Sequence, residues 1–163
     1  MGKKVLVAID VGLVSEASLS YGMQLAARTE SSLTLLAISA PEPTGKRGLS
    51  RMTPEDLESG HKPWLDRIMA ESRERSVGLE VFVTSGRFFE EVIRFVRSRT
   101  GVQFIVMAAP REREEGDGAK SRSLKRLHEE FEGEILLVEK AGQITKVSDR
   151  YSSCRNTCPN LQQ

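Results

Sequence analysis

Short runs of apolar, β-type residues alternate along the chain with longer segments in which apolar residues recur at helical spacing. The five runs, which are mostly apolar, are Val5–Ile9, Leu33–Ile38, Leu79–Thr84, Phe104–Met107 and Ile135–Val138. The four helical segments begin near Val14, Thr53, Phe88 and Ser121. Strands that alternate with helices form a parallel sheet through right-handed crossovers. We therefore predict a doubly wound α/β fold with a five-stranded parallel sheet, and a strand order of 3-2-1-4-5.

The second helical segment contains two prolines and follows a loop rich in Pro, Gly and Ser. Thr53-Pro54-Glu55-Asp56 has the residues of a helix start, and Pro63 should kink or divide the helix that follows. We expect Gly78 to end it. The preceding stretch, Ser39 to Met52, is rich in Pro, Gly and Ser without periodicity and predicts a loop.

Size and charge exclude several classes of protein. The 163 residues suit one domain, which we predict over residues 1–140, with a polar and flexible extension over 141–163. With 24 basic and 23 acidic side chains, the net charge of +1 does not favour nucleic acid as a partner. No apolar run approaches the roughly 20 residues that span a bilayer, so we expect no membrane insertion. The N-terminus lacks the pattern of a signal peptide, and we expect a cytoplasmic protein.

Metal binding is not predicted. The two cysteines, Cys154 and Cys158, lie in the last ten residues with neither histidine nearby in sequence. We interpret them as thiols on a tail. His128 lies on the apolar stripe of the last helix and is interpreted as a packed histidine, because no catalytic partner can be named for it.

Ligands of doubly wound sheets bind at the carboxyl ends of the strands, where the winding direction reverses. For the predicted order this point lies between the first and fourth strands. Asp10 would line it on one side, and Ala108, Ala109 and Pro110 on the other. Asp10 could alternatively cap the turn into the first helix.

The order of these segments resembles the universal stress protein family over residues 3 to 140. The resemblance rests on the lysine-led first strand closing on Asp10, Leu25-Ala26-Ala27, Thr84-Ser85-Gly86, Ile105-Val106-Met107 and Ile135-Leu136-Leu137-Val138. It implies a Rossmann-like domain, related to the adenine nucleotide alpha hydrolase-like folds, and a role in the stress response. It also implies a nucleotide crevice, for which the candidate residues are Asp10, Ile38, Met107, Ala109, Arg111, Ser121 and Ser123.

The glycine motif of the ATP-binding members is degenerate in this chain. Ala108-Ala109-Pro110 follows Met107, and Gly116 and Gly118 lack the two-residue gap of the motif. The helix start is expected at Ser121-Arg122-Ser123, where no glycine precedes the serine. From Arg111 to Lys120 the sequence has three cations and four carboxylates, which disfavours a phosphate. We therefore expect no cofactor, and a regulatory or interaction protein rather than an enzyme, whose unidentified protein partner engages the loop 39–52 or 111–120.

Two alternatives remain open. Arg111, Arg113 and Arg122 could hold phosphate with their side chains, which would make the chain an ATP- or AMP-binding member and a slow ATPase. The last strand, Ile135, Leu136, Leu137 and Val138, lacks any device that protects a sheet edge. The resemblance implies that this edge pairs in a homodimer; the alternative is that Gln143–Val147 folds back to cover it.

Overall fold

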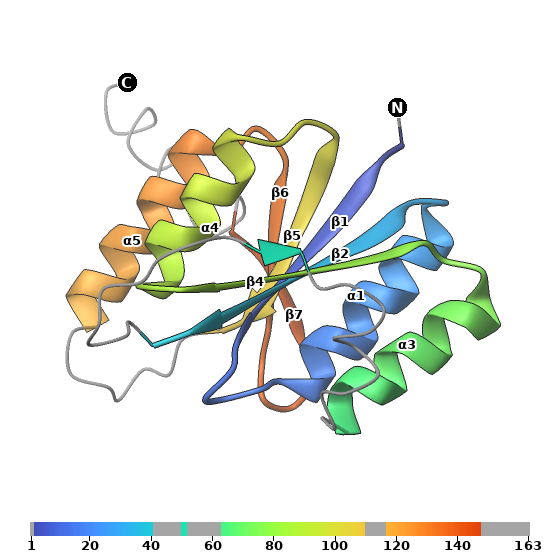
Figure 1. Ribbon diagram of the computed structural model, residues 1–163. Coiled ribbons are helices and arrows are strands. Elements are labelled where there is room, and N and C mark those ends of the chain that lie inside the picture. The colour runs from blue at the N-terminus through green and yellow to red at the C-terminus, as the bar shows by residue number, and fades with distance from the viewer. Residues whose placement is uncertain (1, 41–49, 52–62, 110–116, 148–163) are drawn as a thin grey trace.

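The chain forms a single sheet with helices on both faces (Figure 1). The structure is a computed structural model and describes residues 2–40, 50–51, 63–109 and 117–147. The predicted helix start at Thr53 and the cysteine-bearing tail lie outside these residues. None of the described helices combines the length and the apolar character that crossing a bilayer requires.

The sheet has seven strands in the order β3-β4-β2-β1-β5-β6-β7. Their bounds are β1 Lys4–Asp10, β2 Ser32–Ser39, β3 Ser50–Arg51, β4 Leu79–Ser85, β5 Val102–Ala108, β6 Glu134–Val138 and β7 Ile144–Lys146. The five central strands are parallel and have the predicted 3-2-1-4-5 order. The two outer strands, β3 and β7, are antiparallel to their neighbours and were not part of the predicted sheet.

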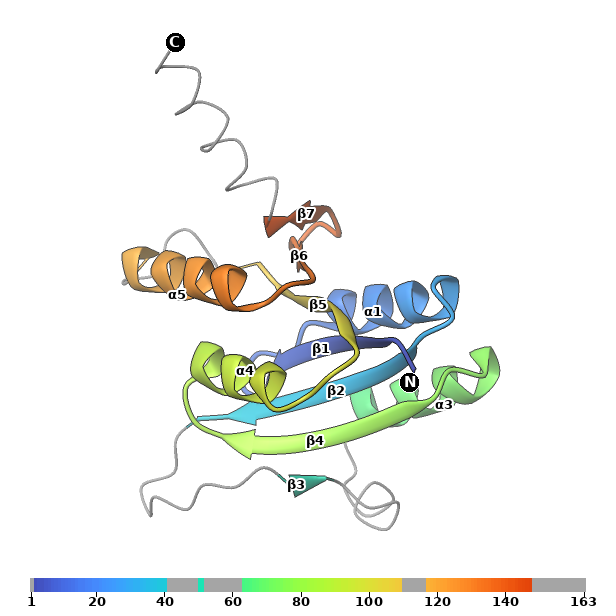
Figure 2. The same ribbon diagram turned by 90° about the horizontal axis from the view of Figure 1, so that it is seen from above.

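The helices form two layers, one on each face of the sheet (Figure 2). Their bounds are α1 Glu16–Arg28, α3 Pro63–Arg75, α4 Phe88–Arg97 and α5 Asp117–Glu130. The apolar faces of α1 and α3 pack with Val5, Val7 and Leu35 in one core. Those of α4 and α5 pack with Leu6, Leu36 and Met107 in the other. Successive residues of one strand thus belong to opposite cores, which explains why these strands are apolar without alternation.

Local sequence signals account for several helix ends. Ser15 caps α1, because its side chain accepts a hydrogen bond from the N–H of Ser18 at 3.2 Å. Pro63 is the first residue of α3, a position that tolerates a missing N–H. The left-handed residue after α3 is Ser76, with a φ of 55°, and not the predicted Gly78. Gly22 lets α1 approach the sheet closely, since a Cβ there would lie 2.3 Å from Val7 Cγ2.

The end of the sheet corrects one prediction. β6 is not an edge strand, because β7 pairs with it, with Leu136 opposite Lys146 and Val138 opposite Ile144. The alternative of a covering strand is therefore confirmed. The sheet continues past residue 140 through β7, and Val147 after it has a fully buried side chain.

The start of α5 corrects a second prediction. The helix begins at Asp117, one turn before the expected start at Ser121. Ser121 and Ser123 therefore lie inside α5, and their amides belong to the helix and not to its opening.

Candidate functional site

The candidate site lies at the carboxyl ends of β1 and β5, where the winding direction of the sheet reverses. β1 lies between β2 and β5 in the sheet, so the reversal falls where the sequence predicted it. Asp10 is the last residue of β1 and is exposed, and it stands opposite Ile38 in the parallel register of β1 and β2.

Asp10 organises the turn that leaves β1. Its Oδ1 accepts a hydrogen bond from the N–H of Gly12 at 2.9 Å, and its carbonyl accepts one from Leu13 at 2.9 Å. The N–H of Val11 donates to the carbonyl of Ile38, also at 2.9 Å. Asp10 thus closes a tight turn between β1 and α1, and the helix itself is capped by Ser15.

The other candidate residues of the crevice are buried or half-buried where their side chains are described. Ile38 and Met107 are 2% and 0% exposed, and both pack into the core beneath α4 and α5. Ala109 is half-buried against the same core. Asp10 is therefore the exposed polar member among the candidates whose side chains are described; Arg111 lies outside the described residues.

The backbone after Met107 is already bonded within the sheet. The N–H of Ala109 donates to the carbonyl of Val138 on β6 at 3.0 Å. Pro110 follows and has no N–H to offer. Residues 109 and 110, in the stretch that the resemblance implies would face a phosphate, therefore present no free amide.

A buried carboxylate at the end of β4 is a feature that the sequence analysis missed. Glu91 is 5% exposed, accepts a hydrogen bond from Thr84 Oγ1 at 3.0 Å and pairs with Arg94 Nη1 at 3.1 Å. It lies over Gly86, which has a φ of 149°. Because Glu91 follows Glu90 in a charged helix turn, its residue type alone gave no sign of burial.

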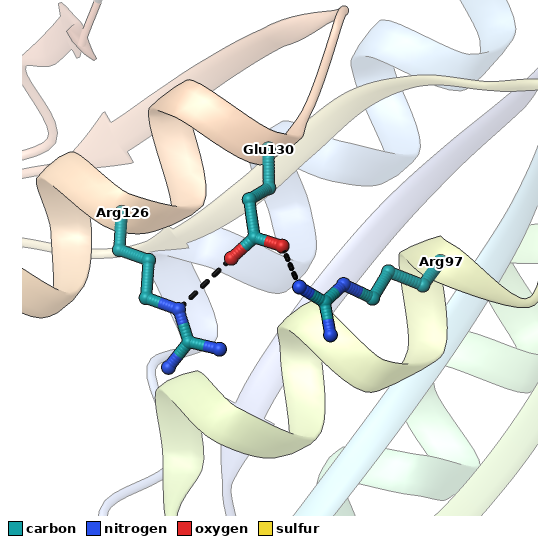
Figure 3. A network of polar contacts seen from close by, with 3 residues as sticks. All are labelled: Arg97, Arg126 and Glu130. Atoms are coloured by element: carbon teal, nitrogen blue, oxygen red, sulfur yellow. Dashed lines mark hydrogen bonds and ion pairs between the residues drawn. The ribbon is translucent and has the colours of Figure 1, made fainter.

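A second charged group joins α4 to α5 at their carboxyl ends (Figure 3). Glu130 accepts hydrogen bonds from Arg97 on α4 and from Arg126 Nε, the latter at 2.9 Å. Partial burial raises the pKa of the Glu130 carboxyl, but the hydrogen bonds and charges of the two arginines outweigh this and leave the pKa below its ordinary value. This group stabilises the helix layer and lies away from the carboxyl ends of the strands.

Among the described residues, no group of three or more His, Cys, Asp or Glu side chains is placed so that it could hold a metal ion. His128 is half-buried in the last turn of α5.

A shallow hollow lies at the opposite end of the sheet, lined by Val102, Gln103, Phe104, Glu132, Gly133 and Glu134. Its place at the amino ends of β5 and β6 is not where doubly wound sheets bind ligands.

The family model described as the universal stress protein family matches residues 1–127. The chain belongs to the universal stress protein family. This match covers the described strands from β1 to β5 and most of α5, and ends before β6 and β7. A search of curated proteins found no sequence that matches the chain.

Solved universal stress proteins have the same fold. A family member from Burkholderia pseudomallei is 19% identical, with a TM-score of 0.53 over 83% of this chain and 95% of that one. A protein from Arabidopsis thaliana, described as having AMP bound, is 16% identical, with a TM-score of 0.51 over 84% and 90%. A universal stress protein described as a complex with cAMP is 12% identical, with a TM-score of 0.51 over 84% and 97%. At these identities the likeness concerns the fold alone.

Proposed function

We propose that this universal stress protein domain is a regulatory or interaction protein that does not bind ATP through the family's usual loop. In this proposal the fold is a scaffold that presents surfaces to a protein partner. The phosphate-binding function of the reversal point has been lost, and no catalytic residue is assigned.

The observation that carries this proposal is the hydrogen bond from the Ala109 N–H to the Val138 carbonyl. Phosphate cradles use free backbone amides that converge on the anion, and glycines let the anion come close. Here one amide is engaged in the sheet, and the next residue, Pro110, lacks one. The first residue of α5 is moreover an acid, Asp117, at the helix end that would otherwise attract a phosphate.

Adenine nucleotide binding is the second candidate. It is supported by two similar structures, one with AMP bound and one in complex with cAMP. In this chain the exposed Asp10 at the end of β1 would contact the sugar or base. The arginines between residues 111 and 122 would replace the missing amides as phosphate ligands.

A thermal-shift titration distinguishes the two candidates. ATP, AMP and cAMP are each titrated with and without magnesium against the full chain. A ligand at one hundred times its Kd stabilises a protein by about 2.7 kcal/mol, which raises the Tm of a domain of this size by roughly 5–10 °C. We expect no saturable shift with any of the three.

Asp10→Ala serves as the site variant, and Asp66→Ala, an exposed acid on α3, as the matched control. A saturable stabilisation that Asp10→Ala abolishes and Asp66→Ala retains would establish the second candidate and end the first.

A further inference from the structure

The ion pairs on α4 and α5 expose their cations much more than their carboxylates. Arg94 on α4 pairs with Glu91, and their side chains are 59% and 5% exposed. Arg97 on α4 and Arg126 on α5 both pair with Glu130; the two arginines are 59% and 54% exposed and the glutamate 23%. In each pair the carboxylate is the more buried partner, so the surface of this helix layer presents mainly the guanidinium groups.

The ion pairs of the opposite helix layer are more even. Arg67 on α3 pairs with Glu16 on α1, with side-chain exposures of 67% and 59%. Within α3, Arg75 and Glu71 are 42% and 31% exposed. Cation and anion reach the solvent together in these pairs and largely cancel, which is the usual state of a surface salt bridge. The excess of exposed cations is therefore a property of the α4–α5 layer.

One carboxylate holds two arginines at the same place on the surface (Figure 3). Glu130 is contacted by Arg97 through Nη2 and by Arg126 through Nε. A guanidinium carries five N–H donors in a planar fork, so Glu130 uses only part of the donors of each arginine. Two cations share a single carboxylate, and this leaves one excess positive charge at a point where α4 and α5 lie side by side (Figures 1 and 2).

The remaining exposed side chains of the two helices add to this charge. Arg122 is exposed and lies four residues before Arg126, on the same side of α5. Among the described side chains of α4 and α5, the exposed carboxylates are Glu90 and Glu129, and the exposed cations are Arg94, Arg97, Arg122, Lys125 and Arg126. We call Arg94, Arg97, Arg122 and Arg126 the arginine face. Since the whole chain has a net charge of only +1, this excess is local.

The chemistry of the arginine face favours carboxylates as its ligands. The planar fork of arginine matches a carboxylate with two parallel hydrogen bonds, which a lysine cannot do. Helices that lie on anionic membranes also insert apolar side chains, but the exposed large apolar residue of the described chain is Leu13, which follows β1 and lies outside α4 and α5. Domains that bind nucleic acid are strongly basic, unlike this nearly neutral chain.

We propose that the arginine face binds an acidic segment of another protein, whose Asp and Glu side chains pair with the exposed guanidinium groups. This inference rests on the interaction function proposed above, for which it names a surface and the chemistry of the partner. The nucleotide titration tests that function at the reversal point of the sheet, so the two proposals can fail separately.

The test uses a fluorescently labelled oligoglutamate peptide as the probe and an oligoglutamine peptide of the same length as its control. Fluorescence anisotropy measures the binding of each peptide to the full chain. We expect the oligoglutamate to bind and the oligoglutamine not to bind. Binding should weaken as salt is raised from about 0.01 M to about 1 M, because the screening length falls from about 30 Å to about 3 Å.

Paired variants locate the binding surface. Arg97→Gln combined with Arg126→Gln removes two cations from the arginine face and should raise the Kd of the oligoglutamate about fivefold or more. Arg67→Gln combined with Arg75→Gln is the matched control, because it removes the same charge from the opposite helix layer. At about 0.1 M salt it should change the Kd by less than about twofold, since distant charges are screened.

A second pair of variants leaves the Glu130 contact intact. Arg122→Glu reverses one charge of the arginine face, and Arg73→Glu reverses an exposed charge on α3. Arg122→Glu should raise the Kd of the oligoglutamate about fivefold or more, and Arg73→Glu should not. Circular dichroism checks the folding of every variant, and this second pair decides if the variant that lacks Arg97 and Arg126 does not fold.

Three results would overturn the proposal. The first is no binding of the oligoglutamate at low salt. The second is an equal loss of binding in the arginine-face variants and in their controls, which would show only a general attraction of the chain to anions. The third is tighter binding to phosphatidylserine vesicles or to single-stranded DNA than to the oligoglutamate, lost in the arginine-face variants. If neither nucleotide nor oligoglutamate binds, the proposed interaction function stands and the arginine face is not its surface.

Discussion

The carboxylate of Glu91 lies so close to Gly86 that a Cβ on this glycine would be 2.6 Å from Glu91 Oε2. The same carboxylate accepts a hydrogen bond from Thr84, so strand end, turn and helix start are tied together by one buried group. Gly86 also donates its N–H to the Ser39 carbonyl on the neighbouring strand at 3.0 Å.

Gly86→Ala should lower the free energy of unfolding by about 2–4 kcal/mol. The alanine would be strained at this positive φ, and its Cβ would also clash with the Glu91 carboxylate. Gly142→Ala is the matched control, since Gly142 has a φ of 90° but a Cβ there would meet no other atom within 4 Å. Its cost should be about 1–2 kcal/mol. Urea unfolding measures both. In a Glu91→Ala background the cost of Gly86→Ala should fall to that of the control, and an unchanged cost would contradict the contact.

Two buried threonines should respond in opposite directions to replacement by valine. Thr34 is 2% exposed and its Oγ1 has no hydrogen-bond partner, so Thr34→Val should raise the free energy of unfolding by about 1 kcal/mol. Thr84 donates to Glu91, so Thr84→Val should lower it by about 1–3 kcal/mol. Chemical denaturation measures the free energy of unfolding of both variants and of the unmodified chain. Destabilisation by Thr34→Val would imply a partner for this hydroxyl, such as a buried water.

The stabilisation that Glu130 gives to the folded protein should be lost at acid pH. Its pKa is lowered in the folded chain from the ordinary value of 4.5, so its stabilising effect is complete above that value and is lost as the pH falls through the lowered pKa. The Tm of the unmodified chain should exceed that of Glu130→Gln at pH 7, and the difference should shrink toward pH 3. Glu129→Gln, an exposed neighbour on α5, should show no such trend. A difference that is constant with pH would argue against the ion pairs with Arg97 and Arg126.

Arg99 should stabilise the end of α4 through two aromatic rings. Its guanidinium carbon lies 4.6 Å from the ring centre of Phe82 and 5.0 Å from that of Phe95. Arg99→Ala should lower the free energy of unfolding by about 1 kcal/mol, and Arg99→Lys by less, since lysine keeps the cation but not the planar stack. Arg28→Ala, at an exposed position on α1, should change it by less than about 0.5 kcal/mol. Equal effects of Arg99→Ala and Arg28→Ala would contradict the contact.

The central sheet was predictable because its five strands are short, mostly apolar runs that are separated from one another by helical patterns. β3 was not, since two residues, Ser50 and Arg51, carry no pattern. β7 was predicted only as an alternative, because Gln143–Val147 alternates too briefly to decide between a strand and a tail. The start of α5 was placed too late, because it was taken from the position of the serine in the family's glycine motif, whereas Asp117 stands in a charged stretch without apolar periodicity.

The candidate site was predicted less completely than the fold. Asp10 lies at the end of β1 as expected, because the end of an apolar run marks the end of a buried strand. The burial of Ile38 and Met107 could not be predicted, since strands that are apolar on both faces do not reveal which side chains reach an opening. The burial of Glu91 depends on the neighbouring Gly86 turn, a tertiary contact that helix periodicity does not contain.

The hydrogen bond from the Ala109 N–H to the Val138 carbonyl limits how a nucleotide site could be restored by design. Replacing Ala108 and Ala109 with smaller residues would leave the amide of residue 109 turned toward β6 and the proline after it unable to donate. A redesigned loop would need its first free donor beyond Pro110, so inserted length, rather than glycine content alone, would decide whether a phosphate could be held.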